Sequence, residues 1–443
     1  MVNLLITTRC NRSCGYCFAK EKIYSSGGSA SHTDITIHDL DRVLDFLAKT
    51  KSSSLQLAGG EPTIHPKFEE ILIKILGKGI YVNVLSNALW NHEKNKLFSN
   101  ISPTKVGFLL NIDHPGTYGP GDLERIEENL FALEGRGNVT LSFNIFEKVP
   151  QCEYIFDIVS KHSFTNIRLS FSMPVLFGKS RNIYLPIEDY SALTPFVMNF
   201  VRRAEASGVC VRMDNTVPLC MLSPDELGEL LLKEVLDRRR NFTCFPAIDI
   251  GPDLSVWRCF GTSGLFNKRL EEFNSLNEVY EYYEMIFKPF KSKVFPMKKC
   301  YDCKYGREGL CQGGCLGFST SKYMELNKMP VEITDEEIVY MKPKLSEEIE
   351  IRKYEIPDTS LILSLKNKEM LEINPLMEHL LNLFDGKRTI GEVMEIYAQK
   401  ITQVGQNEDM LDGFLIDIAS QEVIPTIRKL MDREFLINDD PDR

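Results

Sequence analysis

Three cysteines lie within eight residues near the start of the chain, in the stretch TTRCNRSCGYCFAK. Three thiolates this close, Cys10, Cys14 and Cys17, are compatible with a disulfide, a zinc site, or a metal cluster that keeps one coordination position free. The first residues do not resemble a signal peptide, so we expect a cytoplasmic protein. In a reducing compartment, clustered thiols are more often metal ligands or catalysts than disulfides. The spacing therefore favours a metal centre.

The composition excludes several classes of protein. The chain has 443 residues, of which 43% are hydrophobic, and this is enough for a large core and two or three domains. No apolar run reaches the ~18 residues needed to cross a membrane. The formal net charge of -10 argues against nucleic-acid binding through phosphate neutralisation. We therefore expect a protein that binds neither membrane nor nucleic acid.

The elements that must position the cysteines alternate regularly in the first half of the chain. Short runs rich in β-branched and aromatic residues are each followed by a stretch with helical periodicity. This alternation predicts an α/β fold with a parallel sheet, curved into part of a barrel, whose chemistry collects at the carboxyl ends of the strands. The predicted strands are residues 2–7, 54–58, 80–86, 106–112, 139–146 and 167–173.

Polar residues cluster at or near the ends of these predicted strands. The cysteine loop follows the first strand, and the motif Gly59-Gly60-Glu61-Pro62 follows the second. A single polar residue at a strand end often only faces solvent, but together with the cysteines the set predicts a site. Its further members are Ser86, Asn87, Asn111, Asp113, Asn144, Arg168 and Ser170.

The cysteine spacing, with Tyr16 directly before the last cysteine and GGEP on the next strand, resembles the radical S-adenosylmethionine superfamily. The resemblance implies a partial (β/α)6 TIM barrel. It also implies that Cys10, Cys14 and Cys17 bind three irons of a four-iron four-sulfur cluster, whose fourth iron chelates S-adenosylmethionine. Zinc remains an alternative, but it gives no role to GGEP or Tyr16.

The same resemblance implies roles for the polar set. Gly59, Gly60 and Glu61 would receive the methionine amino group, and Tyr16 would pack near the adenine. Four members of the polar set would contact the ribose and the carboxylate of S-adenosylmethionine: Ser86, Asn111, Asn144 and Arg168. The implied chemistry is a 5'-deoxyadenosyl radical that abstracts hydrogen from a substrate carbon, with the electron supplied by an external reductant such as flavodoxin or ferredoxin.

A second group of cysteines follows residue 210. Its spacing is compatible with a structural zinc knuckle, but after a radical S-adenosylmethionine core it resembles the SPASM or twitch-like extension, which carries one or two auxiliary iron-sulfur clusters. The chain has Leu254 where family members often have glycine, and it has no cysteine after Cys315. The members are Cys220, Cys244, Cys259, Cys300, Cys303, Cys311 and Cys315.

The auxiliary cysteines divide into two predicted ligand sets. One set consists of Cys244, Cys259 and Cys315, with Cys220 as a candidate fourth ligand. The other set consists of Cys300, Cys303 and Cys311, for which Asp302 is one candidate additional ligand; an open iron, or no separate cluster, are the alternatives. The two remaining cysteines, Cys152 and Cys210, have no companions at ligand spacing, and we expect buried thiols rather than hydrogen-atom donors.

The last 99 residues differ in character from the rest. Alternating strands are followed by two short helices that break at Asp385-Gly386, with Asn374, Pro375 and Thr389 at helix starts. This order suggests a winged helix-turn-helix. The stretch LLNLFDGKRTIGEVMEIYA resembles a RiPP recognition element, related to the peptide chaperone of pyrroloquinoline quinone biosynthesis. That resemblance implies binding of a leader peptide as an added strand.

The expected organisation has four parts: a radical core over 1–210, an auxiliary-cluster domain over 211–325, a linker over 326–344 and the leader-binding domain over 345–443. Together they imply an enzyme that modifies a ribosomally made precursor peptide, most simply by an oxidative carbon-carbon, ether or thioether crosslink. A peptide epimerase and a maturase of a folded enzyme are alternatives. An iron-sulfur regulator that binds DNA is an alternative of another class.

Overall fold

The structure is a computed structural model, and it divides into two compact units, Met1–Met329 and Pro330–Arg443. The described residues are 2–19, 34–50, 52–174, 182–292, 294–327, 343–346, 349–353, 360–364, 369–373, 375–404, 427, 430–431 and 435–438.

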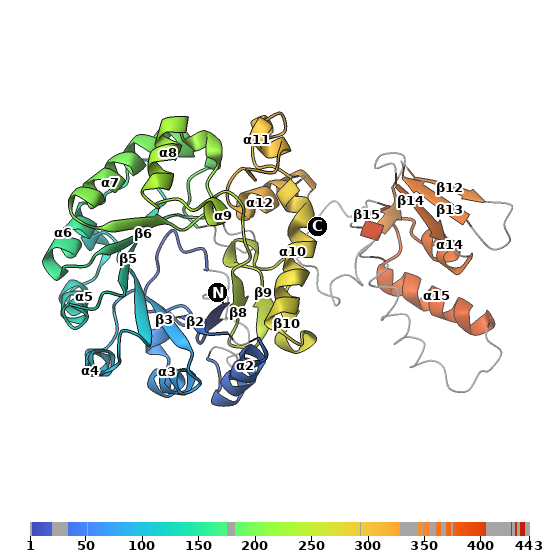
Figure 1. Ribbon diagram of the computed structural model, residues 1–443. Coiled ribbons are helices and arrows are strands. Elements are labelled where there is room, and N and C mark those ends of the chain that lie inside the picture. The colour runs from blue at the N-terminus through green and yellow to red at the C-terminus, as the bar shows by residue number, and fades with distance from the viewer. Residues whose placement is uncertain are drawn as a thin grey trace. The chain divides into compact units, whose positions relative to one another are not determined.

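The first unit is built on one curved sheet of ten strands (Figure 1). The strand order is β10-β9-β8-β1-β2-β3-β4-β5-β6-β7, so β1 to β7 follow one another in space as they do in the chain. All pairs from β1 to β7 are parallel, and β8 is parallel to β1. These strands are β1 (Val2–Leu5), β2 (Ser54–Ala58), β3 (Tyr81–Ser86), β4 (Val106–Asn111), β5 (Val139–Ile145), β6 (Asn166–Phe171), β7 (Cys210–Met213) and β8 (Ile248–Ile250).

The predicted α/β architecture with a parallel sheet is confirmed, and each of the six predicted strand segments contains one strand. Two further parallel strands were not predicted. The first, β7, has only four residues, and its alternate side chains Cys210 and Arg212 are exposed. The second, β8, has three residues and follows a long break in the strand-helix alternation. Such short strands carry too little periodicity to be recognised from sequence.

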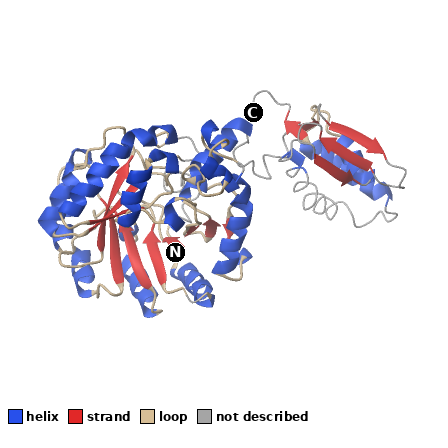
Figure 2. Ribbon diagram, turned by 45° about the horizontal axis from the view of Figure 1, so that its top comes forward, coloured by secondary structure: helices blue, strands red, loops and turns tan. Residues whose placement is uncertain are grey.

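Helices cover the outer face of the curved sheet (Figures 1 and 2). The first of them, α2, shows why: Leu40, Val43, Leu44 and Leu47 repeat at helical spacing and are buried against the sheet, while the Thr36 hydroxyl accepts a hydrogen bond from the Asp39 amide and begins the helix. The helices are α2 (Ile37–Lys49), α3 (Phe68–Gly77), α4 (Glu93–Asn100), α5 (Asp122–Phe131), α6 (Glu153–His162), α7 (Thr194–Ala206) and α8 (Pro224–Leu232).

The segment after α8 packs into the same compact unit as the barrel strands. An antiparallel hairpin extends the sheet beyond β8 and leads into the cysteine-rich loops. Its strands are β9 (Ser255–Trp257) and β10 (Lys268–Arg269), and the helices of this segment are α9 (Arg238–Asn241), α10 (Leu276–Ser292), α11 (Lys304–Arg307) and α12 (Leu316–Asn327). The four-part boundaries remain a prediction, and most of the predicted linker lies outside the described residues.

The second unit contains a three-stranded antiparallel sheet followed by two helices, as the sequence predicts. Its core includes Leu380, Phe384, Ile390 and Val393. The Thr389 hydroxyl accepts a hydrogen bond from the Glu392 amide, which confirms the predicted cap, whereas Asn374 lies outside the described residues. The elements are β11 (Pro343–Leu345), β12 (Ile349–Lys353), β13 (Ser360–Ser364), β14 (Glu369–Ile373), α14 (Pro375–Asn382), α15 (Ile390–Val404) and β15 (Leu436–Asn438), which pairs with β11.

Within the described part of the chain, no helix combines the length and the apolar character that a bilayer span requires.

Candidate functional site

The loop that carries the first three cysteines follows β1 and is held by the GGEP motif. The Gly60 amide donates to the Thr7 carbonyl at 3.0 Å, and the Glu61 amide donates to the Arg9 carbonyl at 2.8 Å. A Cβ on Gly60 would lie 2.2 Å from the Arg9 carbonyl oxygen, closer than any side chain allows. The glycines are therefore required for close contact with the cysteine loop, which the sequence analysis had attributed to the cofactor alone.

The Glu61 carboxylate is buried and already hydrogen bonded on both oxygens. Its Oε1 accepts from the Ser86 hydroxyl at 2.8 Å and from the Thr63 hydroxyl at 2.6 Å and amide at 3.1 Å. Its Oε2 accepts from the Asn87 amide at 2.7 Å. Burial raises the pKa of Glu61, and these hydrogen bonds oppose the rise. The carboxylate thus joins the loop after β2 to the loop after β3, and the Ser86 hydroxyl assigned to the cofactor is engaged in this junction.

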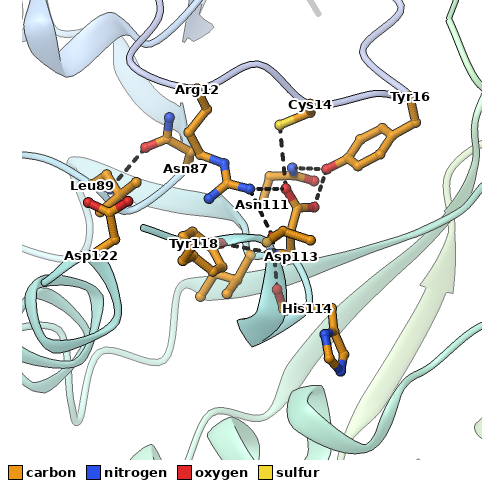
Figure 3. Close-up of polar contacts among 12 residues, drawn as sticks. Arg12, Cys14, Tyr16, Asn87, Leu89, Asn111, Asp113, His114, Tyr118 and Asp122 are labelled. Carbon is orange, nitrogen blue, oxygen red and sulfur yellow. Dashed lines mark hydrogen bonds and ion pairs between the residues drawn. The ribbon is translucent and has the colours of Figure 1, made fainter. Parts of the chain in front are cut away.

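Asp113, at the end of β4, collects contacts from the cysteine loop (Figure 3). Its Oδ2 accepts from Arg12 Nη2 at 2.9 Å and lies 3.4 Å from Cys14 Sγ, while its Oδ1 accepts from the Tyr16 hydroxyl. The guanidinium of Arg12 also lies 3.8 Å from the ring centroid of Tyr118. Asp113 therefore fixes three neighbouring side chains of the loop. The sequence analysis placed Asp113 in the polar set at the strand ends but assigned it no particular contact.

Three of the predicted cofactor residues form one hydrogen-bonded chain. Asn111 donates to the Tyr16 hydroxyl at 2.6 Å, and Asn144 donates to the Asn111 side-chain oxygen. Tyr16 itself is buried and stacks on Phe146 with ring centroids 4.8 Å apart. Arg168, another of the predicted cofactor residues, instead forms an ion pair with Asp214 at 3.3 Å. The structure thus brings Tyr16, Asn111 and Asn144 together and gives Arg168 a different partner.

The first cysteine group, Cys10, Cys14 and Cys17, consists of three half-buried thiols. Burial is the main cause that raises the pKa of Cys10 to about 11, and it does the same for Cys14. Both are therefore neutral thiols at pH 7 unless a metal displaces the protons. The donor set of three sulfurs fits an iron-sulfur cluster with one open iron. No three His, Cys, Asp or Glu side chains among the described residues converge on a point suited to a single metal ion.

The cysteines after residue 210 lie in two groups, and Cys220 lies with Cys300, Cys303 and Cys311 rather than with the set for which it was a predicted candidate. This residue lines a cavity of about 60 Å³ together with Cys300, Cys303 and Cys311. Asp302, the other predicted candidate, is exposed and does not line the cavity. Cys220 precedes its companions by 80 residues or more, and the spacing within the motif could not reveal this partnership. The group that contains Cys300, Cys303 and Cys311 therefore has four cysteines, with Cys220 as the fourth.

The first auxiliary group keeps the other three cysteines. Arg258 Nη1 lies 3.4 Å from Cys244 Sγ and 3.7 Å from Cys259 Sγ. Cys315 Sγ lies 2.8 Å from the thioether sulfur of Met173. Burial raises the pKa of Cys315, and electrostatic repulsion from the other two thiols raises it further. Cys244 and Cys315 are buried, and Cys259 is half-buried.

Proteins with the extension that this segment resembles often have glycine at the position of Leu254. The backbone conformation here explains that preference. Its φ is 66°, in the left-handed region that favours glycine, and its side chain is buried in the turn between β8 and β9. A glycine would adopt this φ without the steric cost that Leu254 incurs.

The two isolated cysteines differ from each other. Cys152 is half-buried and lines a cavity of about 430 Å³ with aromatic walls that include Tyr154, Phe196 and Phe200. Cys210 is exposed, so its predicted burial is wrong. It begins β7, the last strand of the sheet order, where alternate side chains face solvent.

Comparison with known proteins finds a family match in the first part of the chain. Residues 4–138 match the Radical SAM superfamily. The matched segment contains the three N-terminal cysteines, the GGEP motif and strand residues from β1 to β4.

Two curated relatives and one solved structure are similar to the chain. The antilisterial bacteriocin subtilosin biosynthesis protein AlbA of Bacillus subtilis (strain 168) is 24% identical over 345 residues, covering 73% of this chain and 68% of its own. An S-adenosylmethionine-dependent nucleotide dehydratase of Selenomonas ruminantium is 33% identical over 88 residues, covering 19% of this chain and 29% of its own. The solved structure is SuiB of Streptococcus suis bound to the precursor peptide SuiA. It aligns with a TM-score of 0.51 and 16% sequence identity, and the alignment covers 74% of this chain and 72% of the SuiB chain.

The match to the nucleotide dehydratase thus spans less than a third of that protein, and the match to AlbA spans about two thirds of it. The likeness to SuiB shows a shared fold.

Proposed function

We propose that the chain is a radical S-adenosylmethionine enzyme that modifies a ribosomally synthesised precursor peptide by an oxidative crosslink between side chains. The observation that supports this most directly is the collection of three cysteine groups in one compact unit, with the first group in the segment that matches the superfamily. The peptide substrate is supported by similarity to AlbA, a bacteriocin biosynthesis protein, over most of the chain.

Cys10, Cys14 and Cys17 would hold the four-iron cluster that binds S-adenosylmethionine. When bound, this pair supplies a carbon-centred radical that abstracts hydrogen from the substrate. The protein's own contribution is positioning. The GGEP turn holds the cysteine loop, Asp113 orients Cys14 and Tyr16, and the chain of Tyr16, Asn111 and Asn144 would orient the adenosine portion.

The auxiliary groups support an oxidative product, because ring closure by a substrate radical releases one electron that a nearby cluster can accept. Cys220, Cys300, Cys303 and Cys311 would hold a cluster through four thiolates, which leaves no open iron. Cys244, Cys259 and Cys315 would hold the other cluster through three.

The second unit would bind the leader of the precursor. Within the described residues, β12 and β14 are the outer strands of its three-stranded sheet. An outer strand presents backbone amide and carbonyl groups to which an extended peptide can pair. We propose that the leader adds to this sheet and raises the effective concentration of the core peptide at the radical site.

Co-expression with a short precursor encoded beside this gene, followed by mass spectrometry, tests the proposal. We expect the peptide to lose two hydrogen atoms for each crosslink. Its fragmentation spectrum should lack the backbone fragments that arise from cleavage between the joined residues. The variant in which Cys10, Cys14 and Cys17 are all replaced by alanine should yield unmodified peptide, whereas Cys210→Ala, a change at an exposed cysteine, should not affect the yield. A product of unchanged mass that exchanges hydrogen with solvent would indicate epimerisation and refute the crosslink.

A further inference from the structure

Arg258 is a buried arginine in contact with the first auxiliary cysteine group. It is fully buried and stands between β9 and Cys259. Its Nη2 donates to the Cys244 carbonyl at 2.9 Å and also lies 3.4 Å from Cys244 Sγ. Through Nη1 it reaches the sulfurs of both Cys244 and Cys259. The guanidinium therefore points two nitrogens at two proposed cluster ligands.

A guanidinium remains protonated in proteins, so its burial requires either compensating negative charge or several hydrogen-bond acceptors. Glu284 acts on Arg258 electrostatically, but both of its carboxylate oxygens lie 2.6 Å from Lys291 Nζ. The groups in direct contact with Arg258 that can carry negative charge are the sulfurs of Cys244 and Cys259. Arg258 thus has one carbonyl and two sulfurs as its partners at the terminal nitrogens.

A second buried arginine in the chain shows the contrasting arrangement. The guanidinium of Arg136 donates to the carbonyls of Phe98, Ile101 and Val106 at 2.8 to 2.9 Å. Three carbonyl dipoles thus solvate the guanidinium of Arg136. Arg258 has one such carbonyl, and its remaining contacts from the terminal nitrogens are to sulfur.

We propose that Arg258 raises the reduction potential of the auxiliary cluster held by Cys244, Cys259 and Cys315, an inference that rests on the proposed function. Reduction adds one electron, and hence one negative charge, to the cluster. A fixed positive charge and N–H donors at the ligand sulfurs stabilise the reduced form more than the oxidised form. Arg258 thereby makes this cluster the better electron acceptor and positions two of its ligands.

Redox potentiometry with electron paramagnetic resonance tests this role. The full chain would carry alanine substitutions at Cys10, Cys14, Cys17, Cys303 and Cys311, so that the signal of the reconstituted protein comes from the remaining cluster. We expect about four iron atoms per protein in this background. Arg258→Met should shift the midpoint potential to a more negative value. Arg258→Lys, which keeps the charge but loses donors, should give a smaller shift in the same direction.

Arg269→Met is the matched control, because it removes the same charge from an exposed position and should leave the potential unchanged. Should Arg258→Met fail to bind iron, the lysine variant decides: a potential below that of the arginine protein supports the proposal. A loaded cluster whose potential is the same in the arginine and lysine proteins would overturn it, as would an equal shift in the control. A background protein without iron would instead refute the auxiliary cluster of the proposed function.

Discussion

Glu61→Gln tests whether the GGEP glutamate is a structural junction. The substituted side chain is expected to keep its oxygen at the Oε1 position, where three donors from Thr63 and Ser86 meet it. Its amide nitrogen then faces the Asn87 amide, which lies 2.7 Å from Oε2 in the native protein. One charge-assisted hydrogen bond is lost and a buried donor is unpaired, a cost of about 1.5–3 kcal/mol.

Removal of the buried charge offsets part of this cost, because burial raises the pKa of Glu61 and so penalises its ionised form. We therefore expect the free energy of unfolding to fall by about 2 kcal/mol at pH 7. Both tryptophans, Trp90 and Trp257, lie in the first unit, so fluorescence during urea unfolding reports on that unit alone.

Thr63→Val is the matched variant, since it removes one hydroxyl donor and keeps the carboxylate; we expect a loss of about 1 kcal/mol. The binding of S-adenosylmethionine should weaken in proportion to the disorder of the cysteine loop. An unfolding curve for Glu61→Gln that superimposes on that of the native protein, with only the KM for S-adenosylmethionine changed, would show that Glu61 acts as a ligand contact and refute the junction.

Three further predictions concern the cysteine loop, a strained turn and the second unit. Gly60→Ala should displace the Arg9 carbonyl, which its Cβ would approach to 2.2 Å, and reduce the iron bound by Cys10, Cys14 and Cys17; Gly77→Ala, where a Cβ meets nothing within 4 Å, is the control. The free energy of unfolding of Leu254→Gly, measured with urea, should exceed that of Leu254→Ala by about 1 kcal/mol, because φ at this position is 66°; equal stabilities would refute the backbone strain. Deletion of residues 330–443 should leave S-adenosylmethionine cleavage intact but lower modification of the full precursor by about 10²–10⁴-fold, measured by mass spectrometry against a leaderless peptide; unaltered processing would refute leader binding by the second unit.

Local patterns predicted much of the fold. Each of the six strand segments appears in the sheet because a buried parallel strand requires a run of apolar residues, and this requirement is visible in consecutive residues. The cap at Thr389 was predictable for the same reason, since donor and acceptor lie three residues apart. The short strands β7 and β8 were missed because three or four residues do not establish a period.

The sequence by itself predicted the chemistry of the first site, because Cys10, Cys14, Cys17 and GGEP are short local motifs whose residue types define their donors. The tertiary structure decided which distant residues join them. Asp113 meets Cys14 across 99 positions, and Cys220 shares a cavity with Cys311, 91 positions later. Such contacts depend on how strands and loops pack in space, and spacing along the chain carries no record of them. The exposure of Cys210 and the buried charge of Arg258 are of the same kind, because burial is a property of the folded surface and not of the residue type.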